Sequence, residues 1–418
     1  MILDFSIGNF RSFNKVQTLN FRATSLVSEN KQVDEHNITQ TENGGVLKTI
    51  GLYGPNGSGK SNILKALSTF CRLVERSLVS ETVMDTAAES FKLTSEPSDH
   101  SGFFQVQLLI DNKKFRYGFT LRDPGVIFQE WLFGPAERNE TWYFKRTDQD
   151  VEVNKEWFEE ASSLPMDNLR ANTLFLTFAS SYNGAMAQKI RNYIVRRVSF
   201  DVSGVRRASG YYPTNEGRFI IGGSPVRLTN RLVKEGNMSM VLERLKNAGL
   251  IYEGINIEEV DKFVERVLFE KNVLDKRGNI VSKVQMDLDK NESAGTKKFY
   301  AFIGTLHRLF EVGGLLVSDE IDNNFHPSLL QQFVGFFNNP NINKAGAQLL
   351  FTSHDTNLLQ PEILRRDQIY FTEKSMSDET VLYSLADLKG IRNNADFARQ
   401  YLAGYYGALP ILETYKFD

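Results

Sequence analysis

One segment constrains the fold more than any other part of the sequence: residues 54–61 read GPNGSGKS, which fits the phosphate-binding pattern GxxxxGK[ST]. The apolar run KTIGLYG (48–54) predicts a short strand before it, and residues 61–78 carry apolar side chains at helical spacing after it. Glycines let backbone N–H groups curl around phosphate oxygens, and the N-terminus of the following helix favours the same anion. The segment therefore predicts an α/β domain with a phosphate site at a strand–loop–helix junction.

The residue types of this loop predict ATP and Mg²⁺ as ligands. Lys60 is expected to bridge the β- and γ-phosphates, and the Ser61 hydroxyl is expected to ligate Mg²⁺. The alternative is a glycine-rich turn without a ligand, although the pattern arises by chance in only about 0.02 chains of this length. The residues expected to contact the nucleotide here are Gly54, Asn56, Gly57, Ser58, Gly59, Lys60, Ser61 and Asn62.

Two later strands are predicted to end in polar side chains. Residues 315–320, LLVSDE, form an apolar run that ends in Asp319 and Glu320, and LLFTSH ends in His354. Asp319 is expected to hold Mg²⁺, directly or through water, and Glu320 to polarise the attacking water. His354 could reach a γ-phosphate across the site. The alternatives are an ordinary strand end and a structural histidine, and a phosphate loop in the same chain favours the functional interpretation.

The segment ESAGT (292–296) lies just before a predicted helix. Ser293 could cap that helix, and the backbone amides and helix dipole there could bind an anion. The pattern alone favours neither a plain N-cap nor an anion site.

The pattern of apolar and polar residues in the rest of the sequence predicts four structural units. Short, evenly spaced strands in residues 90–150 predict an antiparallel sheet, and the helix–strand alternation from residue 296 predicts an α/β unit. Between them, helices are expected over 230–248, ended by Gly249, and from Asn256, where Glu259 completes a capping box. The expected fold class is α/β, with an antiparallel β subdomain and a large, mostly helical insertion. The expected units are 1–150, an N-terminal lobe; 151–280, a helical and basic insertion; 281–372, a C-terminal lobe; and 373–418, a tail.

Composition excludes several classes of protein. The net charge of −2 excludes a globally basic nucleic-acid coat protein. The single cysteine, Cys71, excludes a disulfide scaffold and a cysteine-based zinc cluster. The start lacks the pattern of a signal peptide, and no apolar run approaches the roughly 20 residues that span a bilayer. We expect a cytoplasmic protein without a membrane segment.

Residues 189–246 are locally basic, with 12 lysines and arginines against four acidic residues. One interpretation is a surface that binds DNA or an acidic protein. The other is a solvated helical face whose charges pair with acidic surface elsewhere in the chain.

The order of motifs resembles ATPases of the ABC class in their SMC, RecF and OLD-like branch. The motifs are NFRSF (9–13), GPNGSGKS, ESAGT, VSDEID and LLFTSH. In that branch two nucleotide-binding domains sandwich ATP, so the resemblance implies a homo-oligomer with composite ATP sites. It assigns Ser293 and Gly295 to the γ-phosphate bound by the facing copy, Glu320 to catalysis and His354 to a switch role.

The resemblance also has departures. Arg11 in the NFRSF motif matches an arginine that lies near the nucleotide in this branch, and a solvated surface arginine is the alternative. The signature reads ESAGT instead of LSGGQ, and none of Gln105, Gln107 and Gln129 is favoured as the Q-loop glutamine.

The tail over 385–410 resembles the C-terminus of stand-alone ATPases of bacterial phage-defence operons, of the RloA or AbiL type and of the PARIS system. This resemblance implies a slow ATPase that serves as a switch or scaffold in abortive infection. OLD nucleases carry a further Toprim domain, for which the sequence after residue 372 leaves no room, so a separate nuclease or toxin is expected as effector. A RecF-like DNA-repair ATPase that binds DNA directly is the alternative; the NFRSF start and the atypical signature argue against a transporter subunit.

Overall fold

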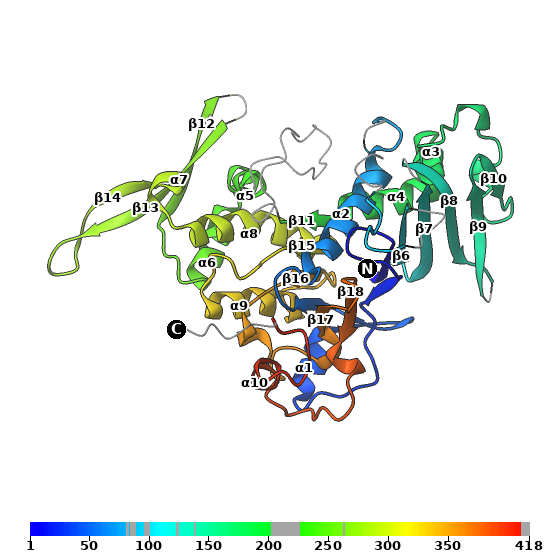
Figure 1. Ribbon diagram of the computed structural model, residues 1–418. Helices are drawn as coiled ribbons and strands as arrows, with labels where there is room; N and C mark the ends of the chain where they lie inside the picture. Colours follow the sequence, from blue (N-terminus) through cyan, green and yellow to red (C-terminus); the bar gives the residue numbers. More distant parts are fainter. Residues whose placement is uncertain are drawn as a thin grey trace.

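The computed structural model describes residues 1–80, 83, 89–95, 101–122, 125–137, 139–201, 226–261 and 264–410. Its centre is a six-stranded sheet in the order β11-β15-β16-β5-β17-β18, in which only β18 runs antiparallel to its neighbour (Figure 1). The strands are β5 (Thr49–Tyr53), β11 (Val198–Phe200), β15 (Leu315–Ser318), β16 (Gln348–Thr352), β17 (Ile369–Lys374) and β18 (Thr380–Ser384). β5, β15 and β16 are buried along their whole length, as expected for parallel strands covered on both faces.

Helices cover both faces of this sheet, and side chains alternate between them as the period of a strand requires. Ile50 and Leu52 belong to the core that contains α2 (Lys60–Arg76) and α4 (Ala185–Arg197). Leu349 and Phe351 belong to the core on the opposite face, with α8 (Ala294–Val312) and α9 (Pro327–Asn338). The predicted strand–loop–helix unit at residues 48–78 is thereby confirmed, and so is the helix–strand alternation from residue 296.

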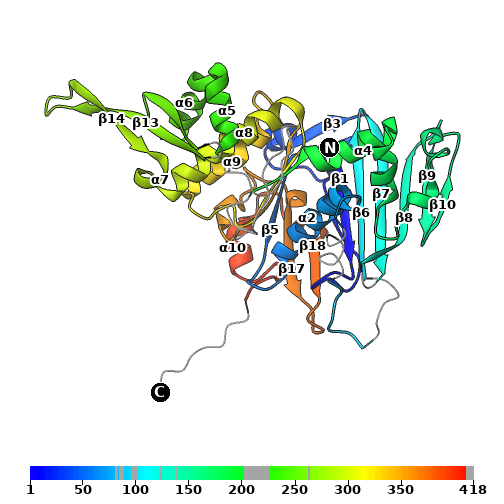
Figure 2. The ribbon, with the colours of Figure 1, turned by 90° about the horizontal axis from the view of Figure 1, so that it is seen from above.

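A seven-stranded antiparallel sheet in the order β10-β9-β8-β7-β6-β1-β2 lies beside α2 (Figure 2). Phe70 of α2 stacks on Phe119 of this sheet, with ring centroids 5.5 Å apart and an angle of 4° between the rings. The expected antiparallel subdomain is confirmed. Its strands are β1 (Ile2–Gly8), β2 (Gln17–Asn20), β6 (Ser101–Ile110), β7 (Lys113–Arg122), β8 (Val126–Pro135), β9 (Glu140–Thr147) and β10 (Asp150–Val153).

The helix expected over 230–248 is present but broken. It consists of α5 (Arg227–Leu232), a π-helical turn at Val233–Asn237 and α6 (Met238–Asn247). Gly236, with φ of 92°, makes the kink inside it, and Gly249, with φ of 78°, follows its end as predicted. The remaining elements are α1 (Lys31–Asn37), β3 (Ile38–Thr41), β4 (Gly44–Leu47), α3 (Phe175–Ser181), α7 (Leu288–Asn291) and α10 (Phe397–Leu402).

The helix expected from Asn256 is wrong. That segment forms a three-stranded antiparallel sheet, in which Asn256 is paired with Leu268 and Glu259 with Glu265. The apolar side chains of Ile255, Val267 and Phe269 share one core with α8, so their spacing of two residues, and not the helical spacing, decides the structure. The insertion is therefore helical over 175–197 and 227–247 but extended afterwards. The strands are β12 (Gly254–Asp261), β13 (Val264–Leu274) and β14 (Ile280–Asp287).

Within the part of the chain that the structure describes, no helix combines the length and the apolar character that crossing a membrane requires.

Candidate nucleotide site

The loop between β5 and α2 is shaped by two glycines that nothing larger could replace. A Cβ on Gly54, with φ of 144°, would lie 2.3 Å from the carbonyl oxygen of Thr372. A Cβ on Gly59, with φ of 110°, would lie 2.2 Å from Oγ1 of Thr380. Gly57, with φ of 78°, has open space around the same position. The loop is therefore fixed by β17 and β18 on one side, while its tip at Gly57 stays open to a ligand.

Lys60 closes this loop from within. Its buried Nζ donates hydrogen bonds to the carbonyl oxygens of Gly54, at 2.7 Å, and Pro55, at 3.1 Å. Burial lowers the pKa of Lys60, while the nearby carboxylates of Asp319 and Glu320 act in the opposite direction. A cation held against the loop in this way is placed to compensate the negative charge of a phosphate.

Ser61 at the start of α2 meets the ends of two parallel strands. Its Oγ donates to Oδ1 of Asp319 at 3.1 Å, and Oγ1 of Thr352 donates to the same oxygen at 2.6 Å. A hydroxyl and a carboxylate oxygen are hard ligands of the kind that Mg²⁺ prefers, and Mg²⁺ commonly takes only one or two protein ligands beside phosphate oxygens and water. Ser61 and Asp319 therefore fit the role predicted for them. No cluster of three or more histidine, cysteine or acidic side chains suited to a metal occurs among the described residues.

Glu320 follows directly and has a left-handed backbone, with φ of 48°. Its N–H donates to Thr352 Oγ1 at 2.6 Å, and its carboxylate accepts from Nδ2 of Asn323 at 2.6 Å. Non-glycine residues with positive φ are uncommon and gather at functional sites, where the surrounding contacts must hold them. The carboxylate is thus directed by a fixed loop of residues 320–324.

A residue that sequence reasoning missed holds this loop in place. Lys298 of α8 is buried, and its Nζ donates to the carbonyl oxygens of Ile321 and Asn323, both at 3.0 Å, with that of Glu320 at 3.5 Å. Burial lowers the pKa of Lys298. In the sequence it is one of two adjacent lysines on an amphipathic helix, and nothing in the pattern distinguishes it from Lys297.

His354 lies next to the same loop. It follows β16, is exposed, and its backbone N–H is 3.4 Å from both carboxylate oxygens of Asp322. The structure therefore brings His354 close to the segment that carries Glu320, while its predicted contact with a γ-phosphate stays a prediction.

The NFRSF turn contacts the phosphate-binding loop through Ser12. Ser12 Oγ accepts from Nδ2 of Asn62 and from Oγ1 of Thr380, both at 2.8 Å, and Thr380 Oγ1 lies 2.8 Å from the carbonyl oxygen of Ser58. Arg11, with φ of 51°, forms an ion pair with Glu89, with Nε 2.7 Å from Oε2. This arginine is thus paired and lines a hollow of about 480 Å³ beside the loop. The lining residues are Arg11, Ser12, Asn62, Glu89, Ser90, Phe91, Lys92, Leu93, Lys374 and Asp378.

Ser293 caps α8, and its Oγ accepts from the N–H of Thr296 at 3.1 Å. Gly295 packs on the loop of residues 320–324, because a Cβ there would lie 2.4 Å from the carbonyl oxygen of Asn324. The described contacts join neither residue to positions 54–62 of its own chain. One chain therefore brings together Lys60, Ser61, Asp319 and Glu320, while Ser293 contacts Thr296 of its own helix and Gly295 contacts Asn324.

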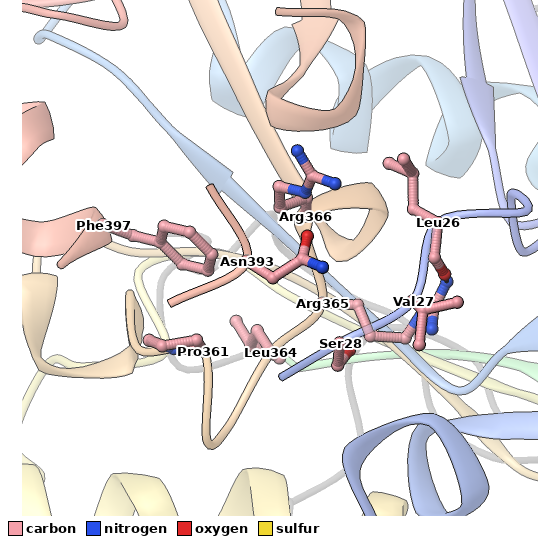
Figure 3. A pocket seen from close by; sticks show the side chains of 9 residues that line it. All are labelled: Leu26, Val27, Ser28, Pro361, Leu364, Arg365, Arg366, Asn393 and Phe397. Atoms are coloured by element: carbon pink, nitrogen blue, oxygen red, sulfur yellow. Dashed lines mark hydrogen bonds between the residues drawn. The ribbon is translucent and has the colours of Figure 1, made fainter. Parts of the chain in front are cut away.

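A second hollow, shown in Figure 3, is too small for a nucleotide. Its volume is about 10 Å³, room for roughly one water molecule. Arg365 at its wall is engaged with Asp34 and Asp367 and donates to the carbonyl oxygen of Leu26 at 2.8 Å. This hollow is part of the packing between the N-terminal segment and the loop before β17.

The basic segment predicted over 189–246 is only partly within the described residues, because residues 202–225 lie outside them. In the described part, Lys189 pairs with Asp111 and Lys234 pairs with both Glu259 and Glu265. Arg191 donates to the carbonyl oxygens of Val74 and Glu75. For Lys189 and Lys234 the structure favours charge pairing within the chain, whereas the described bonds of Arg191 are with backbone carbonyl groups.

The parallel sheet, the loop at β5–α2 and the acidic pair after β15 together define a P-loop nucleotide-binding domain. The family model described as "AAA domain, putative AbiEii toxin, Type IV TA system" matches residues 50–201 and 251–360, which is more than half of the chain, and the chain belongs to that family. A search of curated proteins finds no match to this chain.

Solved structures with a similar fold include heads of SMC proteins. The SMC head domain from Thermotoga maritima is 12% identical, with a TM-score of 0.42 over 92% of this chain and 98% of that one. The Smc head domain bound to the C-terminal domain of ScpA, derived from Pyrococcus furiosus, is 10% identical, with a TM-score of 0.46 over 92% and 97%. The protein cbiO1 from Clostridium perfringens, part of the ABC transporter complex cbiONQ, is 10% identical, with a TM-score of 0.27 over 84% and 87%. These scores are too low to carry an argument about function.

Proposed function

We propose that the chain is an ABC-type ATPase that binds and hydrolyses ATP with Mg²⁺ and acts as a nucleotide-dependent switch. The observation that carries this proposal is the junction at Asp319, where Oδ1 accepts from both Ser61 and Thr352 while Thr352 also fixes the N–H of Glu320. The junction links the phosphate loop, the metal ligands and the candidate base in one set of hydrogen bonds.

The residues divide the chemistry between them. Backbone N–H groups of 56–61 and Lys60 hold the phosphates, and Ser61 and Asp319 hold Mg²⁺, which when bound offsets the charge of the β- and γ-phosphates. Glu320 orients and deprotonates the attacking water. His354, next to the loop of Glu320, serves as a sensor of the γ-phosphate.

The position of Ser293 and Gly295 supports a composite site made by two copies of the chain. Both residues lie at the N-terminus of α8, where backbone N–H groups and the helix dipole favour an anion. Gly295 packs against Asn324, Ser293 caps its own helix, and no described contact joins either residue to positions 54–62 of the same chain. We therefore assign the γ-phosphate that they serve to a facing copy. The hollow at Arg11 and Asn62 would then take part of the nucleotide held by its own chain.

The biological role that we propose is a cytoplasmic ATPase switch or scaffold of anti-phage defence by abortive infection. It would work with a separate effector, a nuclease or a toxin. The family description, which names a toxin of a type IV toxin–antitoxin system, supports a place in such a two-component system. Residues 189–246 are the candidate surface for DNA or for an acidic phage protein.

The test uses Glu320→Gln, which keeps the size of the side chain and removes its basicity. We expect the variant to retain ATP and Mg²⁺ while phosphate release falls at least about a hundredfold. Glu362→Gln, a change of the same kind at an exposed position, is the control. Unchanged turnover of Glu320→Gln would show that another group is the base.

The same trapped variant tests the biological role. It is purified under native conditions with ATP and Mg²⁺, and bound proteins are identified by mass spectrometry. A nuclease or toxin present at a stoichiometric ratio supports the proposal. Recovery of DNA without a protein partner would instead favour a RecF-like repair ATPase.

A further inference from the structure

The sheet formed by β12, β13 and β14, which we call the arm, projects from the body beside α7 and α8 (Figures 1 and 2). β13 lies in its centre, and β12 contacts α6. Among the described residues no strand is hydrogen-bonded to the outer edge of β14. Alternate N–H and C=O groups of β14 therefore point away from β13 without a strand to receive them.

The outer part of the arm is apolar as well as exposed. Ile280 and Val281, at the register shift in the pairing of β14 with β13, are 62% and 61% exposed, and Val284 is 42% exposed. On β13, Leu274 is 57% exposed. Proteins usually protect long edge strands with prolines, lysines, bulges or a cover. β14 contains no proline, its one lysine, Lys283, is paired with Glu270, and its pairing with β13 is regular from Ser282 to Asp287, beyond a register shift next to Ile280. Exposed apolar side chains along an open edge mark an interaction surface.

Charge indicates which partner fits this edge. The outer half of the arm, residues 271–283, holds four basic residues and one acidic residue. Lys271 and Lys283 pair with Glu292 and Glu270 inside the chain, whereas no ion pair of Lys276 or Arg277 occurs among the described residues. At the opposite end of β14, the exposed Asp289 also has no ion pair among them. A second arm laid antiparallel would place the basic tip of each copy near the acidic base of the other.

We propose that two copies of this chain associate by antiparallel pairing of their β14 strands, which makes one continuous six-stranded sheet. Two copies paired in this way are related by a two-fold axis perpendicular to the sheet. One residue of β14 must therefore lie directly opposite the same residue of the partner subunit. Lys283 in that position would oppose two ammonium groups across neighbouring strands, which is destabilising. Val284 in that position gives an apolar pair and sets Lys283 against Gln285 of the partner subunit.

This interface is separate from the composite ATP site and does not depend on the proposed ATPase activity. If both interfaces form, each chain has two different neighbours, and the assembly grows beyond a dimer. β14 leads through α7 directly to Ser293, so the pairing would anchor the segment that precedes α8.

Disulfide cross-linking tests the register. In Val284→Cys the two cysteines would face each other in a directly opposed pair, at a separation suited to a disulfide. The natural Cys71 is buried and gives no background. We expect Val284→Cys to form a covalent dimer on mild oxidation without nucleotide, also in the Lys60→Ala background. Val312→Cys, at an exposed valine on α8, should form no covalent dimer. Equal yields from the two variants, or no dimer from Val284→Cys, would overturn the proposal.

An exchange of charges tests the antiparallel direction of the pairing. It also controls for folding, because two variants can restore a dimer on mixing only if both are folded. The variant with Lys276→Glu and Arg277→Glu, and separately the variant Asp289→Lys, should each raise the dimer dissociation constant about tenfold in sedimentation experiments. Mixing the two variants should restore the dimer, because the reversed tip then meets the reversed base. If the mixture associates no better than either variant alone, the antiparallel arrangement is wrong.

Discussion

Nζ of Lys298 lies 3.0 Å from the carbonyl oxygen of Ile321, so the helix that begins at Ser293 is bonded to the loop that carries Glu320. The same ammonium group also reaches the carbonyl oxygens of Glu320 and Asn323. The hydrogen bonds described for this buried cation are with that loop and not with positions 54–62, so we infer that it positions the loop that carries Glu320.

We predict that Lys298→Met lowers kcat about tenfold while the affinity for ATP stays nearly unchanged, because the loop loses its three bonds to the helix. The substitution also leaves these carbonyl groups without their hydrogen-bond donor, which lowers the free energy of unfolding by about 1–3 kcal/mol. Turnover and binding of a fluorescent ATP analogue, measured separately, check the split. Lys297→Met on the same turn is the control. Loss of binding in parallel with kcat would point to a general loss of structure.

Lys60→Ala should lower the affinity for ATP at least about a hundredfold, because charge-assisted hydrogen bonds to phosphate are lost from a buried position. Lys65→Ala, at an exposed position of the same helix, should bind ATP as the unchanged chain does. Equilibrium dialysis with labelled ATP makes the comparison. Retained affinity in Lys60→Ala would reject the phosphate-binding assignment of this loop.

Two glycines of the loop should respond differently to the same substitution. Gly59→Ala places a Cβ against Thr380 and is expected to cost about 1–3 kcal/mol of stability and to abolish ATP binding. Gly57→Ala meets no atom within 4 Å and should cost only the smaller strain of its backbone. Thermal unfolding and ATP binding of both variants check the difference. Equal destabilisation would mean that contact with β18 does not shape the loop.

We predict that the folded chain loses stability at high pH because of a buried tyrosine near its C-terminal end. Burial raises the pKa of Tyr401 to about 12, and its hydroxyl donates to the carbonyl oxygen of Ala408 at 3.0 Å. An unfolded tyrosine loses its proton near pH 10, so the folded chain binds more protons between pH 10 and 12 and its stability falls as the pH rises. We expect this tyrosine to contribute up to about 2–3 kcal/mol to that fall. Urea unfolding at pH 9, 10 and 11 should show a flatter decline for Tyr401→Phe than for the unchanged chain.

The sequence predicted the phosphate loop and the strands around it because short patterns with a mechanism suffice for them. Gly54, Gly59 and Lys60 belong to one contiguous motif, and Asp319 and Glu320 end an apolar run whose burial is readable from composition. The convergence of Ser61 with Asp319 also followed, since parallel strands end at one edge of a sheet.

The features of the site and of the fold that the sequence could not predict depend on contacts between distant segments. Lys298 is distinguished from Lys297 only by burial against residues 320–324, and Thr352 becomes a partner of Asp319 only because β15 and β16 are neighbours. The sequence wrongly predicts a helix from Asn256, where β12 and β13 form, because Asn256 and Glu259 imitate a capping box. The alternative period of two is decided by the packing of Phe269 on Tyr300, whose ring centroids are 5.3 Å apart.

The position of β5 in its sheet has a consequence for the synthesis of the chain. β5 lies between β16 and β17, with Thr49 beside Leu349 and Gly51 beside Ile369. Both neighbours of the strand that leads into the phosphate loop are thus made about 300 residues later, and pairings of such high contact order form late and slowly. A nascent chain that stops before residue 348 has the complete GPNGSGKS motif but neither neighbour of β5, so we expect it to bind nucleotide only after β16 and β17 have been made.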